Sequence, residues 1–176
     1  MWGPLASELV YYTGVKSFRL IVLAVLALSF AGCTNTPNGG LVGKTAPDFS
    51  ITDSDHTVSL RDYRGKIVIL NLWARWCPPC VEETPSLIRL QKRMGDKAII
   101  LAVSMDDDDK AYHRFLKDYG VDFLTVRDVK KEAIGLFSPT GPPETYVIDR
   151  AGTIRRKFIG PQRWDGDDFV QYLNKL

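Results

Sequence analysis

The sequence predicts an α/β fold in which helices cover a β-sheet. Two runs have the length and composition of strands buried on both faces: Ile67 to Trp73, which is apolar except for Asn71, and Ala98 to Val103, which is wholly apolar. Between them, Leu87, Leu90 and Met94 recur at helical spacing. This strand–helix–strand order predicts two parallel strands joined by a right-handed crossover. The composition, with 45% hydrophobic and 25% charged residues, is that of an ordinary globular protein.

The remaining elements surround this unit. A β-hairpin comes before it as an N-terminal extension, and a helix, a short strand, a small helix, a second hairpin and a closing helix follow it. In chain order we expect them at residues 49–52 and 57–60, 111–119, 124–127, 129–137, 144–149 and 154–159, and 169–176. The helix at 111–119 should bury a face that includes Tyr112, Phe115 and Tyr119. Two charged runs, 106–109 and 155–157, are interpreted as solvated surface.

The amino-terminal segment has the features of a secretory signal peptide. Lys16 and Arg19 precede a run of twelve mostly apolar residues, Leu20 to Ala31, which is short for a membrane span of about 20 residues. The end of the run, Phe30-Ala31-Gly32-Cys33, resembles the lipobox of bacterial lipoproteins. That resemblance implies that Cys33 becomes the first mature residue and carries a lipid.

These features divide the chain into three parts. We expect a signal peptide over 1–32, a tether over 33–42 without core-forming residues up to Gly40, and one domain over 43–176. The first 14 residues carry no basic residue, so the natural start is expected near Val15. The balance of 23 basic and 21 acidic residues gives no reason to expect nucleic-acid binding.

The chemistry is expected at Cys77 and Cys80, where the first buried strand meets the following helix. Two cysteines separated by two residues at a helix N-terminus can close a disulfide, and the helix dipole favours a thiolate there. Cys77 would cap the helix with its sulfur exposed and would exchange disulfides with a substrate. Cys80, one turn further in and more buried, would resolve the mixed disulfide.

The residues between and after the cysteines adjust this chemistry. Pro78 costs nothing at the first helical position, but Pro79 removes a second N–H, which leaves the Cys80 N–H as the nearest donor to the Cys77 sulfur. Fewer donors mean a less stabilised thiolate and a more reducing disulfide, so we expect a reductant. Glu83 lies on the same helical face as Cys80 and could take its proton; alternatively, Glu82 and Glu83 merely favour the positive helix end.

Residues 43–176 resemble the TlpA/ResA branch of the thioredoxin superfamily, and more narrowly the DsbE/CcmG reductases of cytochrome c maturation. The resemblance is carried by four motifs: Ala46-Pro47-Asp48-Phe49, Trp73-Ala74-Arg75-Trp76-Cys77-Pro78-Pro79-Cys80, Glu83, and Gly141-Pro142-Pro143-Glu144-Thr145-Tyr146-Val147-Ile148-Asp149. It implies a thioredoxin fold with a central mixed β-sheet flanked by helices. It also implies an extracytoplasmic, membrane-anchored thiol:disulfide oxidoreductase.

The resemblance also implies roles for individual residues. Pro143 matches a cis-proline beside the two cysteines, and Glu83 matches the active-site acid. Glu144 matches an acid that suggests active-site electrostatics or substrate fit; an exposed strand residue is the equal alternative. Trp76 is expected to contact substrate, while its neighbour Trp73 packs in the core. Pro142 precedes the cis-proline and, lacking an N–H, offers a substrate backbone only its carbonyl.

The partners expected from this interpretation are a disulfide-bearing protein substrate, a membrane thiol donor that re-reduces the enzyme, and the membrane itself through Cys33. We expect a monomer whose redox group is the Cys77–Cys80 pair, without a cofactor or a metal. Two alternative functions exist on the same fold. A peroxiredoxin-like peroxidase needs Thr or Ser and Pro at the positions held by Ala74 and Leu70, and a copper chaperone would have to use His56 or His113 beside the cysteines.

Overall fold

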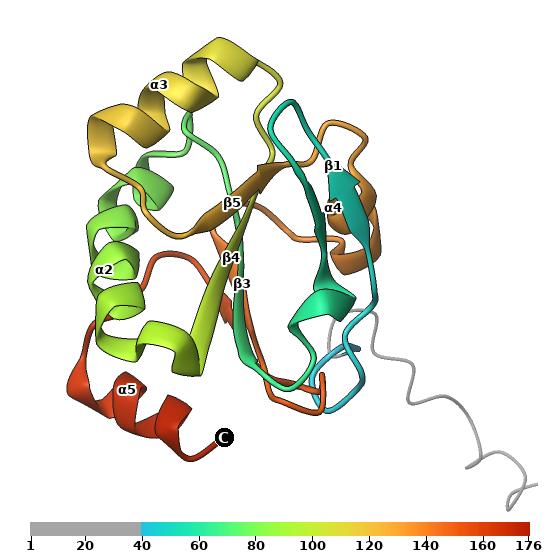
Figure 1. The fold of residues 1–176 in the computed structure, drawn as a ribbon, viewed down its shortest axis with the longest axis vertical. Helices are drawn as coiled ribbons and strands as arrows, with labels where there is room; N and C mark the ends of the chain where they lie inside the picture. Colours follow the sequence, from blue (N-terminus) through green and yellow to red (C-terminus); the bar gives the residue numbers. More distant parts are fainter. Residues whose placement is uncertain (1–39) are drawn as a thin grey trace, which may run out of the picture. The chain divides into compact units, whose positions relative to one another are not determined.

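The computed structural model describes residues 40–176. The predicted signal peptide, Cys33 and most of the predicted tether lie outside these residues. Figure 1 shows the described part as a β-sheet with helices on both faces. None of its helices combines the length and the apolar composition that crossing a lipid bilayer requires.

The elements follow the predicted order closely. Both long apolar runs are strands, and the helix between them begins at the first proline after Cys77. In chain order the elements are β1 Ser50–Thr52, β2 Thr57–Ser59, the 3-10 turn η1 Leu60–Tyr63, β3 Ile67–Trp73, α2 Pro78–Met94, the 3-10 turn η2 Gly95–Lys97, β4 Ala98–Ser104, α3 Asp109–Tyr119, β5 Leu124–Arg127, α4 Glu132–Phe137, β6 Glu144–Ile148, β7 Ile154–Ile159 and α5 Asp167–Asn174.

The central sheet has five strands in the order β5-β4-β3-β6-β7. Strands β3, β4 and β5 are parallel, β6 runs antiparallel to β3, and β7 runs antiparallel to β6. The two remaining strands, β1 and β2, form a separate antiparallel hairpin. The structure therefore confirms the predicted mixed sheet, its parallel strand–helix–strand unit and the N-terminal hairpin.

Two hydrophobic cores lie on opposite faces of the sheet, because successive side chains of a strand point to opposite sides. Ile67, Ile69 and Trp73 of β3 pack with α2, α3 and α5, whereas Val68 and Leu70 pack with the hairpin and α4. Figure 1 shows the same division, with α2 and α5 on one side of the sheet and α4 with β1 on the other. Strand β3 is buried along its whole length, which explains why its sequence is apolar at every position except Asn71.

The bounds of several elements differ from the prediction by one or two residues, and two larger differences have a physical reason. The small helix begins at Glu132 rather than at 129, because the Asp128 carboxylate accepts the backbone N–H groups of Glu132 and Ile134 and fixes the helix start there. Tyr119, expected on the buried face of α3, is 43% exposed. It stands at the end of the helix and stacks on the outer side of Phe115, with ring centroids 4.3 Å apart.

Candidate active site

The two cysteines of the Cys-Pro-Pro-Cys segment lie at the amino end of α2, directly after the end of β3. Cys77 is the N-cap residue, and its sulfur accepts the backbone N–H of Cys80 at 3.2 Å. Pro78 and Pro79 occupy the first two helical positions and have no N–H to offer. The structure thus confirms Cys80 as the expected donor to the Cys77 sulfur. The two cysteines form a disulfide, with their Cα atoms 5.3 Å apart.

Both cysteines are buried in this disulfide form. Cys77 is 4% exposed and Cys80 2%, so the expectation of a solvent-facing Cys77 sulfur is wrong here. The Cys77 sulfur is bonded to the Cys80 sulfur and also accepts the Cys80 N–H, so both of its contacts are with the buried residue. The surface beside the disulfide is formed by the flanking residues: Trp76 is 57% exposed, and Pro78 is exposed as well.

The loop before β6 reaches the same end of the sheet. Strand β6 pairs with β3 up to Leu72 and Glu144, so Pro143 follows the register to the place where β3 ends. The peptide bond between Pro142 and Pro143 is cis, as the resemblance implied. Pro143 is buried and Pro142 is half-buried. The sheet register therefore brings this loop to the strand end from which the chain leads to Cys77.

Glu83 lies on the inner face of α2, one helical turn after Cys80, and is 3% exposed. Its carboxylate accepts three hydrogen bonds: Asn71 Nδ2 donates to Oε1 at 2.9 Å, and Gln162 N and Trp164 Nε1 donate to Oε2 at 3.0 and 2.9 Å. Burial raises the pKa of Glu83, while these bonds oppose that shift. The alternative in which the acid serves the helix dipole loses its basis, because the first turn of α2 holds no acidic residue.

Glu144 is fully buried, so its interpretation as an exposed strand residue is wrong. It points to the face of the sheet that carries the hairpin and α4, together with Tyr146, whereas α2 and the disulfide lie on the other face. Its carboxylate accepts the N–H and hydroxyl of Thr140 and the Tyr146 hydroxyl, and pairs with Lys157 at 3.0 Å. Lys157, expected to be solvated, has only 19% of its side chain exposed.

Sequence reasoning did not identify the partners of Glu83. Asn71 interrupts an otherwise apolar strand, and this single polar residue in a buried run was the available signal. Its amide also donates to Thr145 Oγ1 at 2.9 Å, which connects β3, β6 and α2. Gln162 and Trp164 are too distant in the sequence for any spacing rule to connect them with Glu83.

A second group that the sequence did not reveal holds the segment just before Cys77. Asp106, expected in a solvated run, is 2% exposed at the end of β4. Its carboxylate accepts the Arg75 backbone N–H at 3.0 Å and the Ser104 hydroxyl at 2.8 Å, and lies 3.5 Å from the Arg75 guanidinium. Trp73, as expected, packs in the core against the rings of Tyr112 and Phe115.

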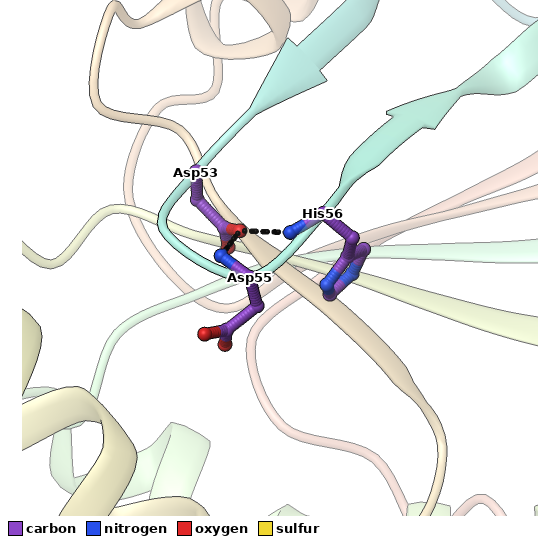
Figure 2. Close-up of side chains that lie close together, drawn as sticks. All are labelled: Asp53, Asp55 and His56. Carbon is purple, nitrogen blue, oxygen red and sulfur yellow. Dashed lines mark hydrogen bonds between the residues drawn. The ribbon is translucent and has the colours of Figure 1, made fainter.

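The two histidines lie at the hairpin turn and on α3. Figure 2 shows Asp53, Asp55 and His56 in the turn between β1 and β2, where their ligand-type atoms lie within 4.8 Å of one another. Asp53 uses its oxygens to accept backbone N–H groups of Asp55, His56 and Arg127. Both ring nitrogens of His113 are engaged, with the Asp109 carbonyl and the Asp55 carboxylate. Within residues 40–176, this cluster of possible ligand atoms at the turn includes neither Cys77 nor Cys80.

Comparisons with known proteins show the family of this chain. The sequence pattern of the AhpC/TSA family matches residues 42–157. The thiol-disulfide oxidoreductase ResA of Bacillus thuringiensis is 33% identical over 166 residues, covering 90% of this chain and 95% of ResA. The thioredoxin-like protein YneN of Bacillus subtilis is 38% identical over 67% of this chain and 71% of its own length.

Among solved structures, a thiol:disulfide interchange protein of the DsbE type from Chlorobium tepidum superposes with a TM-score of 0.70. It is 27% identical and is matched over 76% of this chain and 96% of its own. These likenesses confirm the predicted thioredoxin fold and the oxidoreductase chemistry. The chain therefore belongs to the AhpC/TSA family, and it is a thiol:disulfide oxidoreductase related to ResA and DsbE.

Proposed function

We propose that this protein is a reductase of protein disulfides that works outside the cytoplasm, held at a membrane by a lipid on Cys33. Its task would be cytochrome c maturation or a related assembly reaction. The observation that carries the proposal is the Cys77–Cys80 disulfide at the start of α2, with the buried acid Glu83 one turn away. The cysteine pair is its own redox group, so the reaction needs no further cofactor.

The reaction would proceed in two exchanges. The Cys77 thiolate attacks a substrate disulfide, forms a mixed disulfide and releases one substrate thiolate. The Cys80 thiol then gives its proton to Glu83 and attacks the Cys77 sulfur, which releases the second substrate thiolate and closes the Cys77–Cys80 disulfide. Burial raises the pKa of Glu83, which makes this carboxylate a better proton acceptor than an exposed one. A thiol donor, proposed to be a membrane protein, returns two electrons to the disulfide.

The surface that meets the substrate would comprise Trp76, Pro78 and Pro79 beside the disulfide, and Pro142 and Pro143 across from it. Trp76 provides the large exposed apolar side chain next to Cys77. Glu144, which accepts two hydrogen bonds from Thr140, would fix the shape of the proline loop from behind and so act on substrate fit indirectly.

Substrate trapping tests this function. In Cys80→Ser, the mixed disulfide at Cys77 cannot be resolved, so the variant should accumulate covalent adducts with oxidised substrate proteins. Cys77→Ser is the matched control, since it keeps one cysteine but removes the attacking sulfur, and it should trap far less. Equal trapping by both variants, or no reduction of insulin disulfides by the native protein, would refute the proposal.

A further inference from the structure

The loop between β7 and α5, residues 160–166, supplies two of the three hydrogen bonds to Glu83. The Gln162 backbone N–H and the Trp164 indole N–H both donate to Oε2, whereas the third donor, Asn71, uses Oε1. A carboxylate oxygen accepts about two hydrogen bonds. Oε2 is therefore saturated by two N–H groups that cannot accept a proton in return, and Oε1 keeps an open acceptor position.

The Trp164 indole is held firmly in this arrangement. Its ring is 1% exposed and meets the rings of Phe158 and Phe169 edge to face, at centroid distances of 5.3 and 5.1 Å. Its backbone N–H donates to the hydroxyl of Ser86 on α2 at 3.3 Å. The indole N–H therefore keeps its direction toward Glu83 without needing the acid to orient it.

Ion pairs with exposed arginines of α2 also hold this loop and the start of α5. None of these pairs includes Glu83. Arg89 binds the Asp165 carboxylate at 2.6 Å, and Arg93 donates to the Asp165 carbonyl and binds Asp167, the first residue of α5, at 2.7 Å. From the sheet, the groups near the acid are the neutral Asn71 and Thr145. Within residues 40–176, no ion pair involves Glu83, and the titratable groups closest to it along its own helix are Cys80, Cys77 and Glu82.

We propose that Trp164 is a positioning residue for the thiol exchange: with Gln162 it occupies Oε2 of Glu83, so that the proton of Cys80 is delivered to Oε1. The inference rests on the proposed role of Glu83. In the step, the S–H bond of Cys80 breaks, an O–H bond forms at Oε1, and the Cys80 sulfur bonds to Cys77 as the substrate sulfur leaves with the electron pair. Because the indole N–H can only donate a hydrogen bond, it stabilises the ionised form of Glu83. The carboxylate is therefore ready to accept the Cys80 proton in the next reaction cycle.

Titration of Glu83 by carbon NMR, in protein labelled in the glutamate carboxyl, tests the contact directly. Trp164→Phe keeps a ring but removes the N–H, so the Glu83 midpoint should rise by about one pH unit. Phe169→Leu is the matched control, because it disturbs the same ring cluster and leaves the N–H in place; its midpoint should stay at the native value. An unchanged midpoint in Trp164→Phe, or an equal shift in the control, would overturn the proposal.

The native protein provides a second measurement that needs no variant to fold. The indole N–H resonance of Trp164 should shift with pH at the same midpoint as the Glu83 carboxyl, in both oxidised and reduced protein. If the Trp164 resonance does not shift at the Glu83 midpoint, the proposed effect of the indole N–H on Glu83 is overturned.

The kinetics separate this proposal from the proposed function. The rate at which Cys80 resolves a mixed disulfide should fall at low pH. In Trp164→Phe, the pH at which the rate falls should be higher by the same amount as the NMR midpoint of Glu83. If the midpoint moves but the rate profile does not, or if Glu83→Gln resolves as fast as the native protein, Glu83 is not the proton acceptor. If the midpoint itself does not move, the positioning role of Trp164 fails and the role of Glu83 stands.

Discussion

The Cys77 sulfur receives one backbone N–H, from Cys80, because prolines occupy the two intervening positions. At a helix start, the N–H groups of the second and third positions point at the capping side chain. Pro79 holds the second position, so it removes a donor that would stabilise a Cys77 thiolate. Pro78 holds the first position, where an N–H points elsewhere. The two prolines therefore have different effects on the redox couple.

Pro79→Ala should make the disulfide more oxidising. The added N–H stabilises the thiolate of the reduced form, and one hydrogen bond to a charged group corresponds to a rise in potential of about 30 mV. Equilibration with glutathione buffers, read by mass spectrometry after thiol alkylation, measures this change. Pro78→Ala is the control and should shift the potential much less; equal shifts would show that the donor geometry is not the cause.

Lys157 neutralises a carboxylate that is otherwise buried. Lys157→Met should destabilise the protein by about 2 to 3 kcal/mol, since Glu144 would lose its cationic partner while remaining fully buried. Urea unfolding at neutral pH measures the loss. Lys117→Met, at an exposed position on α3, should change the unfolding free energy by less than about 0.5 kcal/mol. Similar values for the two variants would show that the Glu144–Lys157 pair does not contribute to stability.

The residues that carry the chemistry were predictable only in part. Cys77, Cys80 and Glu83 share one short segment, so their spacing on a helix could be read directly. Two of the three donors to Glu83, Gln162 and Trp164, lie 79 and 81 positions away along the chain, and only the tertiary fold brings them to it. Glu144 shows a related limit: its burial follows from which face of β6 it occupies, and that requires the strand register.

At the scale of elements, the hairpin β1–β2 is connected to α3 by a pair that depends on pH. His113 Nε2 bonds the Asp55 carboxylate at 2.7 Å, and Nδ1 bonds the Asp109 carbonyl. The bond to Asp55 is the main reason that the pKa of His113 is raised, followed by the bond to Asp109. Arg127, which pairs with Asp109, and the hydroxyl of Ser54 complete the surroundings of this contact.

A histidine whose pKa is higher in the folded protein stabilises it fully below the unfolded value of about 6.5. That contribution is lost as the pH rises through the higher folded pKa. Amides of β1 and β2 should therefore exchange with solvent more readily, after correction for intrinsic rates, at pH 8 than at pH 5.5. His113→Gln should remove the difference, while His56→Gln should keep it. If His113→Gln keeps the difference in amide exchange between pH 8 and pH 5.5, a group other than His113 causes it.

The bounds of helices and strands were predicted well where the local hydrophobic pattern of the sequence determines them. Strand β3 matches its predicted bounds because a largely apolar run between two turns defines it, and the short strand β5 also has its predicted bounds. The start of α4 was missed because it depends on the Asp128 carboxylate, whose capping bonds do not change the hydrophobic pattern.

For the whole molecule, the sheet register explains how one site arises from distant segments. The ends of β3 and β4 and the start of β6 meet at one edge of the sheet. The start of α2, Asp106 and the loop with the cis Pro142–Pro143 bond therefore lie at this edge. The loop after β7 then closes over α2 and reaches Glu83. The parallel order of β3 and β4 was predictable because a helix connects them. The contact of the loop 160–166 with α2 was not, because it depends on how α5 packs.

The reduction potential of the Cys77–Cys80 pair tests the central claim most directly. Redox equilibration of the native protein should show one two-electron couple that disappears when either cysteine is replaced by serine. With only one N–H at the Cys77 sulfur, its potential should lie nearer the value of thioredoxin, about −270 mV, than that of the oxidant DsbA, about −120 mV. A potential close to −120 mV, or a couple that survives the loss of Cys77 or Cys80, would contradict the account.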